Sequence, residues 1–464
     1  MSKTSHDTMP VTKQLASFAA NLRFEQLPAE VVEHVKLATL DGLGCCLCGA
    51  DLPWTRMLIE TVLADGATGP ATVFGTPHKT SLAGAALINA TSGHGFELDD
   101  IHRDSIIHPN SVAVPAALNT AEALGGATGE QVITAIVAGY EVANRIGAAA
   151  GSQLLLRGFH PQGTGGALAG AATAGHMMGF DETKMLHAIG IAGSLGAGLM
   201  AAQEGAMVKR LHSGRTAEAG VRAAQLASRG FTGIEDLVEA EYGGFASAYA
   251  GHTNVERALQ GLGSEWEVLK TGFKPYAMVT SIHAALDCLK TIMADNGLKA
   301  GDIGKITAHI SKPTYVHCAW DYKAQSVTAA QMNLYYGLAM IALEGEAFID
   351  QFAEARIGAD DVMDFIKCID AEIDPEIEAR GATFRHMARV SVTTKDGRTF
   401  KHEETNRRGS PENPVSPDDI RAKFDALAGP VLSANGAAAL ADDVARLEKL
   451  PEITPVTELL TGPR

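Results

Sequence analysis

The sequence predicts a mainly α-helical chain, in which a large all-helical domain is completed by the C-terminal helices and a smaller α+β domain is inserted before them. Three observations support this architecture. Apolar residues recur at helical spacing through roughly the first 265 residues, strand-like alternation is confined to the stretch that follows, and helical spacing returns after Pro411 and Pro414. We therefore expect a helical domain over 1–265, an α+β lid domain over 266–404, and returning helices over 405–464.

The helical pattern is clear near the start of the chain. Val11, Leu15, Phe18 and Leu22 fall on one face of a helix, and Pro28 stands near the start of a second helix, a position that proline favours. Later helical segments end at glycine or at polar turns, as helix C termini often do. The segment after residue 404 is too short for a good core of its own, so we expect it to pack on the first domain.

The middle of the chain has a different character. Residues 265–276 are rich in β-forming residues, and a helix is expected over 281–297. Residues 304–312 alternate apolar and polar side chains, which predicts a half-buried strand. Residues 388–403 read as a hairpin, because Asp396-Gly397 supplies the residues that a tight turn prefers.

The composition excludes some classes of function. A formal net charge of −16 argues against nucleic-acid binding, which depends on lysine and arginine neutralising phosphates. The same charge repels anions at long range, so a site for a carboxylate must be locally positive. The first residues contain no apolar signal core, so we expect a cytoplasmic protein with reduced thiols. Cys45 and Cys48 form a CxxC without a second ligand pair, and core packing is the favoured interpretation.

No membrane span is expected. Residues 158–180 lack Asp, Glu, Lys and Arg and are long enough to consider. They also contain His160, Pro161 and several glycines, so a buried helix with a functional loop before it is the better interpretation.

Four polar clusters interrupt the apolar sequence, and the first is the loop 95–109. It contains six acidic or histidine side chains: Glu97, Asp99, Asp100, His102, Asp104 and His108. Carboxylates beside histidine can orient an imidazole and raise its pKa. The same loop could bind a divalent metal, or could simply be solvated.

The second cluster, 157–170, places His160 before a glycine-rich turn that opens a helix. Backbone amides at a helix N terminus favour an anion, so a carboxylate could sit there beside His160. The alternative is a turn histidine that satisfies its own neighbours. No strand precedes this segment and the glycine spacing is wrong for a dinucleotide site.

The third and fourth clusters are basic. In 205–220, Lys209 and His212 follow an apolar run, and a partly buried lysine can serve as acid, base or anion anchor. In 272–287, Lys274 and His283 flank the start of the α+β domain. A solvated basic turn for 205–220, and an exposed Lys274 with a core histidine for 272–287, are the structural alternatives.

The sequence contains no nucleophile elbow, no phosphate loop and no HExxH motif, and nothing implies a flavin, nicotinamide or pyridoxal site. The remaining chemistry is acid/base catalysis by histidine and lysine, with positive charge for a carboxylate. We therefore expect no organic cofactor.

The clusters resemble, in order along the chain, the motifs of the MmgE/PrpD family, which includes 2-methylcitrate dehydratase, cis-aconitate decarboxylase and iminodisuccinate epimerase. The matching segments are LDGLGCCLCGA near residue 40, LDD at 98–100 with HP at 108–109, GFHPQGT, KRLHSGR, KPY at 274–276 with His283, and SPENPVSPDDIRAKF near the end. The resemblance covers nearly the whole chain. It implies a homodimer without metal or organic cofactor and an active site between the two domains.

The resemblance also implies which residues form the site. Catalysis is expected from His160, Lys209 and His108, and substrate binding from Glu97, Asp99, Lys274, His283, Tyr336 and His212. The expected substrate is a small di- or tricarboxylate. Dehydration of a hydroxy-carboxylate ranks first, because loss of water needs only such groups. Decarboxylation of a cis-aconitate-type acid and epimerisation of an amino- or imino-dicarboxylate are alternatives, and a non-catalytic carboxylate-binding protein is the alternative outside enzymes.

Overall fold

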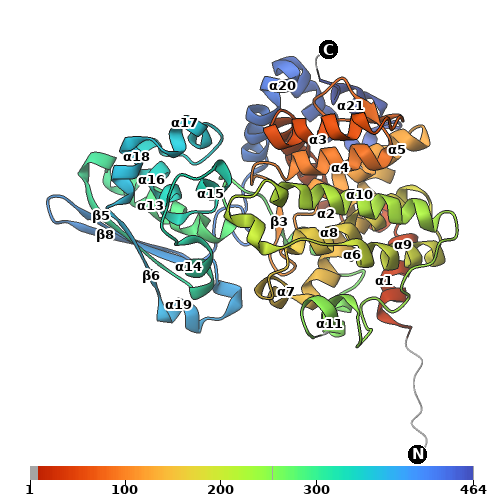
Figure 1. The fold of residues 1–464 in the computed structure, drawn as a ribbon, viewed down its shortest axis with the longest axis horizontal. Coiled ribbons are helices and arrows are strands. Elements are labelled where there is room, and N and C mark those ends of the chain that lie inside the picture. Colours follow the sequence, from red (N-terminus) through yellow and green to blue (C-terminus); the bar gives the residue numbers. More distant parts are fainter. Residues whose placement is uncertain (1–8, 253, 463–464) are drawn as a thin grey trace, which may run out of the picture. The chain divides into compact units, whose positions relative to one another are not determined.

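The computed structural model describes residues 9–252 and 254–462, and it confirms a mainly α-helical fold (Figure 1). The chain divides into two compact units. The helical unit comprises the described residues up to Met200, Val208–Gly272, and those from Ser416 onward. The sheet unit comprises Ala201–Met207 and Phe273–Val415. No helix in the described part of the chain combines the length and the apolar character that a membrane crossing requires.

The helical unit is built from fourteen α-helices within the described residues. They are α1 (Val11–Asn21), α2 (Ala29–Gly49), α3 (Pro53–Ala64), α4 (Leu82–Gly93), α5 (Asn110–Leu124), α6 (Gly129–Ala150), α7 (Ser152–Leu156), α8 (Pro161–Met177), α9 (Glu182–Leu195), α10 (Val208–Ala227), α11 (Phe245–Tyr249), α12 (Val255–Leu259), α20 (Pro417–Ala445) and α21 (Thr454–Leu459).

Helix α8 is the centre of this unit. It packs against α5, α6, α9 and α10, and every residue from Pro161 to Gly175 is buried. The expected glycine-rich turn is in fact helical, because α8 begins directly after His160. Its glycines allow close approach instead: a Cβ at Gly166 would lie 2.7 Å from Thr216 Oγ1 of α10, and one at Gly220 of α10 would lie 2.5 Å from the carbonyl oxygen of Ala167.

The sequence predicted an all-helical domain, but the helical unit also contains short strands. Two pairs of two-residue antiparallel strands interrupt it: β1 (Ala71–Thr72) pairs with β2 (Lys79–Thr80), and β3 (Ile101–His102) pairs with β4 (Thr271–Gly272). These strands are too short to show alternation, so no periodicity in the sequence marks them.

The sheet unit contains a four-stranded sheet in the order β6-β5-β7-β8. The strands are β5 (Ile303–Ile310), β6 (Ile369–Ile373), β7 (Ala388–Thr394) and β8 (Thr399–Glu404), and the helices are α13 (His283–Asn296), α14 (Lys312–Cys318), α15 (Val327–Gln331), α16 (Leu334–Glu344), α17 (Glu354–Ile357), α18 (Asp360–Ile366) and α19 (Pro375–Ala379). Strand β5 is parallel to β6 and antiparallel to β7, and α13 packs against β7 and β8.

The helix at 281–297, the strand at 304–312 and the hairpin at 388–403 correspond to α13, β5 and β7–β8. Gly397 in the hairpin turn has φ +88°, which only glycine adopts readily. The β-rich prediction for 265–276 was wrong: Glu267–Lys270 form a 3-10 helix, and only Thr271–Gly272 pair as a strand. The side chain of Glu267 is held by three polar partners, described below, and these tertiary contacts outweigh strand propensity.

The two C-terminal helices expected at 416–427 and 434–450 are the two halves of α20, which is kinked at Ser433 (φ +67°). Its first half packs on α2, where Phe424 and Leu427 approach Gly44. The units change at 272/273 and 415/416, whereas the expected domains change at 265/266 and 404/405. The β3–β4 pair explains the first boundary, because it ties Thr271–Gly272 to the helical unit.

Candidate active site

Six of the nine predicted site residues come together in the helical unit. Glu97 and Asp99 follow α4, His108 precedes α5, His160 is the residue before α8, and Lys209 and His212 lie in the first turns of α10. The loop that carries the first three is fixed by Asp100, which accepts hydrogen bonds from Tyr140 Oη (2.7 Å) and from the backbone amide of Asn110 (3.0 Å). The remaining three, Lys274, His283 and Tyr336, belong to the sheet unit.

Glu97 is the centre of a buried charge cluster. Lys209 and Arg210 both form ion pairs with its Oε1, the second at 2.6 Å, and all three side chains are buried. Two cations thus contact one carboxylate, and the buried carboxylate of Asp99 lies beside this cluster. Glu97 also has φ +57°, a left-handed conformation that non-glycine residues rarely adopt and that is concentrated at functional sites.

Four imidazoles form a row beside this cluster, which we call the histidine row: His108, His94, His160 and His212. Successive ring centroids lie 4.9, 5.8 and 5.1 Å apart. Nδ1 of His160 and Nδ1 of His212 are 2.9 Å apart, so one of them donates a hydrogen bond to the other. All four side chains are buried.

Three imidazoles of the histidine row, those of His94, His160 and His212, are uncharged at neutral pH when the site is empty. Burial lowers the pKa of His160 well below its usual value, and the charges of Lys209 and of the other imidazoles lower it further. Burial likewise lowers the pKa of His212 to about 4 and that of His94 in the same direction. The neutral imidazoles can accept protons, and Lys209 beside them can bind an anion.

Asp99 orients the row at its centre. Its Oδ2 lies 2.7 Å from His94 Nδ1, and its Oδ1 lies 3.5 Å from His108 Nδ1. His108 Nδ1 also lies 2.6 Å from the carbonyl oxygen of Asp100. The Nδ1–H groups of both imidazoles are therefore used to hold the rings, and Nε2 is the basic nitrogen of each neutral ring.

Gln162 in the first turn of α8 links three of the segments. Its Oε1 accepts from the amide of His108 (2.8 Å), and its Nε2 donates to the carbonyl of His108 (3.1 Å) and to Ser213 Oγ of α10 (2.9 Å). Gln162, Arg210 and His94 are not among the site residues predicted from the sequence. The sequence marks them only as polar side chains within GFHPQGT, within KRLHSGR and at the end of an apolar helix.

The rest of the acidic loop does not join the site. His102 Nε2 lies 2.9 Å from Glu267 Oε2, and Asp104 pairs with Arg257 at 3.1 Å. Arg257 and Lys270 also contact Glu267. This group fastens the β3–β4 region and is structural.

The three candidates in the sheet unit are all buried there. His283 Nε2 lies 2.9 Å from the carbonyl oxygen of Met278. Tyr336 donates its hydroxyl to the carbonyl of Gln351, and its ring packs on Tyr322 at 5.1 Å. Lys274 is 1% exposed, which excludes the alternative of an exposed lysine.

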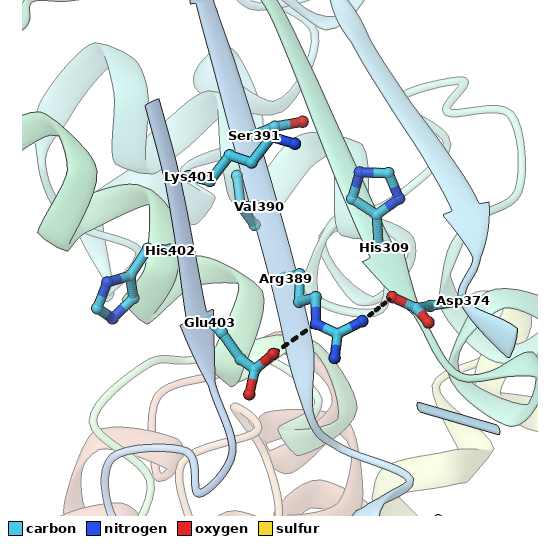
Figure 2. A pocket seen from close by; sticks show the side chains of 8 residues that line it. All are labelled: His309, Asp374, Arg389, Val390, Ser391, Lys401, His402 and Glu403. Carbon is cyan, nitrogen blue, oxygen red and sulfur yellow. Dashed lines mark hydrogen bonds and ion pairs between the residues drawn. The ribbon is translucent and has the colours of Figure 1, made fainter. Parts of the chain in front are cut away.

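The sheet unit also has a hollow of about 420 Å³ on the sheet (Figure 2). Arg389 of β7 lies in it and forms ion pairs with Asp374, Glu376 and Glu403. Figure 2 shows the carboxylates of Asp374 and Glu403 on either side of the guanidinium. Because the arginine is already over-neutralised, this hollow offers an anion little attraction.

His94, Asp99 and His108 are also the group within the described residues whose ligand atoms could surround a metal ion, since these atoms lie within 4.8 Å of one another. The cysteines of α2 form no disulfide, and Cys45 and Cys46 are buried. The charge of Lys209 acts on His94 and His160 and would oppose a divalent cation in the row.

The whole chain resembles known enzymes. The model of the MmgE/PrpD N-terminal domain matches residues 13–258, and that of the C-terminal domain matches residues 276–449. A cis-aconitate decarboxylase of Aspergillus terreus (strain NIH 2624 / FGSC A1156) is 30% identical over 486 residues, covering 100% of this chain and 99% of the relative. The cis-aconitate decarboxylases of Homo sapiens and Mus musculus are 27% and 26% identical, covering 98% of this chain and 95% and 94% of the relatives. The chain is therefore a lyase and belongs to the MmgE/PrpD family.

Proposed function

We propose that this lyase removes CO2 from an unsaturated tricarboxylate of the cis-aconitate type. The observation that carries the proposal is the pair of buried cations, Lys209 and Arg210, that contact Glu97 beside a row of imidazoles in which burial keeps His160 neutral. Such a site attracts a polyanion and can transfer a proton to it. The relatives named above, all cis-aconitate decarboxylases, favour decarboxylation over the other reactions that these groups can perform.

The reaction needs one positioned acid and one positive group. The bond between carbon and the departing carboxylate breaks, and its electron pair forms a new carbon–carbon double bond. The electron pair of the old double bond takes a proton at its far carbon. One proton enters and one CO2 leaves, and the product is a dicarboxylate with a terminal alkene.

The residues of the helical unit divide these roles. A bound polyanion raises the pKa of nearby imidazoles, so His160 becomes protonated in the complex and donates to the carbon. Lys209 forms the proton-transfer pair with it and stabilises the negative charge that develops as CO2 leaves. His108 holds a substrate carboxylate.

Dehydration of a hydroxy-tricarboxylate is the second candidate. It requires a base for the proton next to a carboxylate and an acid for the departing hydroxyl. The site has both, because neutral His160 lies close enough to Lys209 for the ammonium charge to lower its pKa. In dehydration, His160 acts as the base and Lys209 as the acid, while the contacts to the substrate carboxylates stay the same.

Proton NMR of the enzyme in D2O tests the choice. With cis-aconitate we expect loss of CO2, a terminal alkene signal and one deuterium in each product molecule. Citrate, 2-methylcitrate, malate, tartrate and iminodisuccinate are run in parallel. A new alkene from 2-methylcitrate without CO2 loss from cis-aconitate would establish dehydration instead, and deuterium exchange in iminodisuccinate would indicate epimerisation.

We further propose that the reaction needs no metal, because Lys209 supplies the positive charge that a metal ion would otherwise supply. Activity is expected to survive dialysis against EDTA and to be unchanged by added Zn²⁺ or Mg²⁺. Loss of activity on dialysis and its return with one metal would assign the metal to His94, Asp99 and His108. We also propose a homodimer, for which light scattering should give twice the mass of the chain.

A further inference from the structure

Two segments that resemble family motifs have no part in the proposed chemistry: LDGLGCCLCGA in α2, and SPENPVSPDDIRAKF, which runs into the start of α20. The structure joins them through a buried ion pair, in which Lys423 Nζ of α20 lies 2.6 Å from Asp41 Oδ1 of α2. The side chain of Asp41 is 0% exposed and that of Lys423 is 8% exposed. A buried ammonium is costly unless it is paired and hydrogen-bonded, so each partner of Lys423 bears on its role.

Lys423 also reaches the loop that carries the candidate site. Its Nζ donates a hydrogen bond of 2.6 Å to the carbonyl oxygen of Leu98. Leu98 directly follows Glu97, whose carboxylate pairs with Lys209 and Arg210. Glu97 has φ +57°, and a left-handed conformation of this kind persists where surrounding contacts hold it. The ammonium of Lys423 supplies such a contact one residue later.

The ion pair holds the same loop at a second point. Asp41 Oδ2 accepts a hydrogen bond from Asn110 Nδ2 (2.9 Å), and the backbone amide of Asn110 donates to Asp100 Oδ1 (3.0 Å). The loop is therefore fastened at Leu98 directly and at Asp100 through Asn110. Both connections start from the Asp41–Lys423 pair.

The glycines of LDGLG bring the three elements together. A Cβ on Gly42 would lie 3.3 Å from Cβ of Asn110, the first residue of α5. A Cβ on Gly44 would lie 3.2 Å from Cδ2 of Phe424, the residue after Lys423. Close packing of α2 against the start of α5 and against α20 thus accompanies the ion pair and limits the positions that its side chains can take.

We propose that Lys423, paired with Asp41, is a positioning residue that holds the backbone of the acidic loop, so that Glu97 keeps Lys209 where the transition state requires it. The inference rests on the proposed function, in which Lys209 stabilises the charge that develops as CO2 leaves. Helix α20 then completes the active site as well as the core, and Lys423 acts through the loop. A misplacement of about 1 Å at a catalytic group can cost about 10²-fold in rate.

A second buried lysine provides the control. Lys36 of α2 also binds the C-terminal segment, through Glu448 Oε2 (3.1 Å) and the carbonyl oxygen of Ala445 (3.1 Å). Among the described residues, its hydrogen bonds and ion pairs do not extend to the acidic loop. Lys423→Met and Lys36→Met should both lower the melting temperature, so a comparison of their activities separates positioning from stability.

Kinetics with cis-aconitate give the main readout, at a temperature at which circular dichroism shows both variants folded. We expect kcat to fall about 10²-fold in Lys423→Met, with a smaller change in KM, and to stay unchanged in Lys36→Met. Binding of tricarballylate, a saturated tricarboxylate, measured by calorimetry, should weaken much less than kcat falls. Equal kcat values for the two variants would overturn the proposal.

A double variant covers the case in which Lys423→Met does not fold. Lys423→Met leaves the Asp41 carboxylate buried without the charge of Lys423, whereas Asp41→Asn/Lys423→Met removes both charges and keeps an oxygen that can accept from Asn110. This double variant should regain most of the lost melting temperature and still show the loss of about 10²-fold in kcat, because the contact with Leu98 is missing. Recovery of kcat together with stability would assign the pair to stability alone.

A double-mutant cycle identifies the residue through which Lys423 acts. Glu97→Gln removes the carboxylate that receives Lys209, so adding Lys423→Met to it should lower kcat little further. Losses that multiply in the combined variant would contradict an action through Glu97.

The same assays separate this inference from the function on which it rests. A wild-type enzyme that neither binds tricarballylate nor releases CO2 from cis-aconitate overturns the proposed function, and the inference falls with it. An active wild type whose Asp41→Asn/Lys423→Met variant is equally active overturns the inference alone.

Discussion

Lys209 and Arg389 are both cations in contact with carboxylates, yet the ratio of charges is reversed between them. In the helical unit, Lys209 and Arg210 share the single carboxylate of Glu97, and all three are buried. In the sheet unit, Arg389 is surrounded by three carboxylates in an open hollow, and its side chain is 26% exposed (Figure 2). The first group has two cations on one carboxylate, and the second has three carboxylates on one cation.

This difference separates a site from a surface. Water screens the excess charge around Arg389, so that arrangement costs little and contributes little. Charge inside a buried cluster is not screened in this way: burial lowers the pKa of His160, and the charge of Lys209 lowers it further. We infer that a substrate carboxylate completes this buried cluster. Variants in the two regions test the difference between them.

The largest effect is expected from Lys209→Met. Because Glu97 keeps its 2.6 Å contact with Arg210, the variant should fold, while the charge that stabilises the transition state is lost. We expect kcat to fall by at least about 10³-fold. The matched control is Lys401→Met in the hollow of Figure 2, which should leave kcat unchanged. Comparable activity in the two variants would show that Lys209 has no catalytic role.

His160→Asn should lower kcat by about 10²–10⁴-fold, because the proton donor is removed while the side chain remains polar. His402→Asn, in the lining of the hollow of the sheet unit, serves as its control and should be fully active. Deuterium incorporation into the product in D2O measures the proton transfer directly. A His160→Asn variant with normal turnover would move the role of acid to another residue of the histidine row.

These candidate catalytic residues could be selected from the sequence because polar side chains interrupt apolar helices. His160 and Lys209 stand out in this way, and their helices meet because small residues face each other at Gly220 of α10. His94 could not be selected on the same ground, because it reads as the polar end of a helix. Only the fold places its ring between two others.

The acidic loop shows more clearly which contacts cannot be predicted from the sequence. The sequence grouped His102 and Asp104 with the site, but their partners are Glu267 and Arg257, more than 150 residues later in the chain. The same partners turn 267–270 into a 3-10 helix where β-forming residues predicted a strand. Contacts at such separations follow from the packing of whole elements, and no local pattern encodes them. The helices, the sheet hairpin and the mainly α class depend on local spacing and were predictable.

Loss of a buried ion pair in the helical unit should reduce stability more than loss of an exposed ion pair in the sheet unit. Lys423 of α20 pairs with Asp41 of α2 at 2.6 Å, and both are buried. Lys423→Met leaves Asp41 without its charge partner, so we expect a loss of about 3–5 kcal/mol in the free energy of unfolding, measured with urea. Proton uptake by Asp41, whose pKa burial already raises, would reduce this loss at low pH. Lys305→Met, which breaks an exposed pair with Asp370, is the control and should cost less than about 1 kcal/mol.

Acid should weaken the folded enzyme through the histidine row. The pKa of His212 is lowered to about 4 and that of His160 is lowered as well, so the unfolded chain binds protons that the folded chain refuses as the pH falls below about 6.5. The melting temperature is expected to fall between pH 7 and pH 5, and to fall less with tricarballylate bound. His160→Asn should flatten this dependence. A melting temperature that is constant over this range, with or without ligand, would contradict a neutral buried row.

The smallest effect is expected from Arg389→Met, which removes the exposed cation of the comparison. Removal of the guanidinium leaves Asp374, Glu376 and Glu403 near one another, but Glu376 and Glu403 are exposed to solvent, and buried Asp374 keeps its hydrogen bonds from the backbone amides of α19. We expect the free energy of unfolding to fall by no more than about 1 kcal/mol, with unchanged kcat and KM. Because carboxylate repulsion is screened, 0.5 M NaCl should remove most of the loss. A loss as large as that of Lys423→Met, insensitive to salt, would mean that charge imbalance alone does not distinguish a buried site from an exposed surface in this protein.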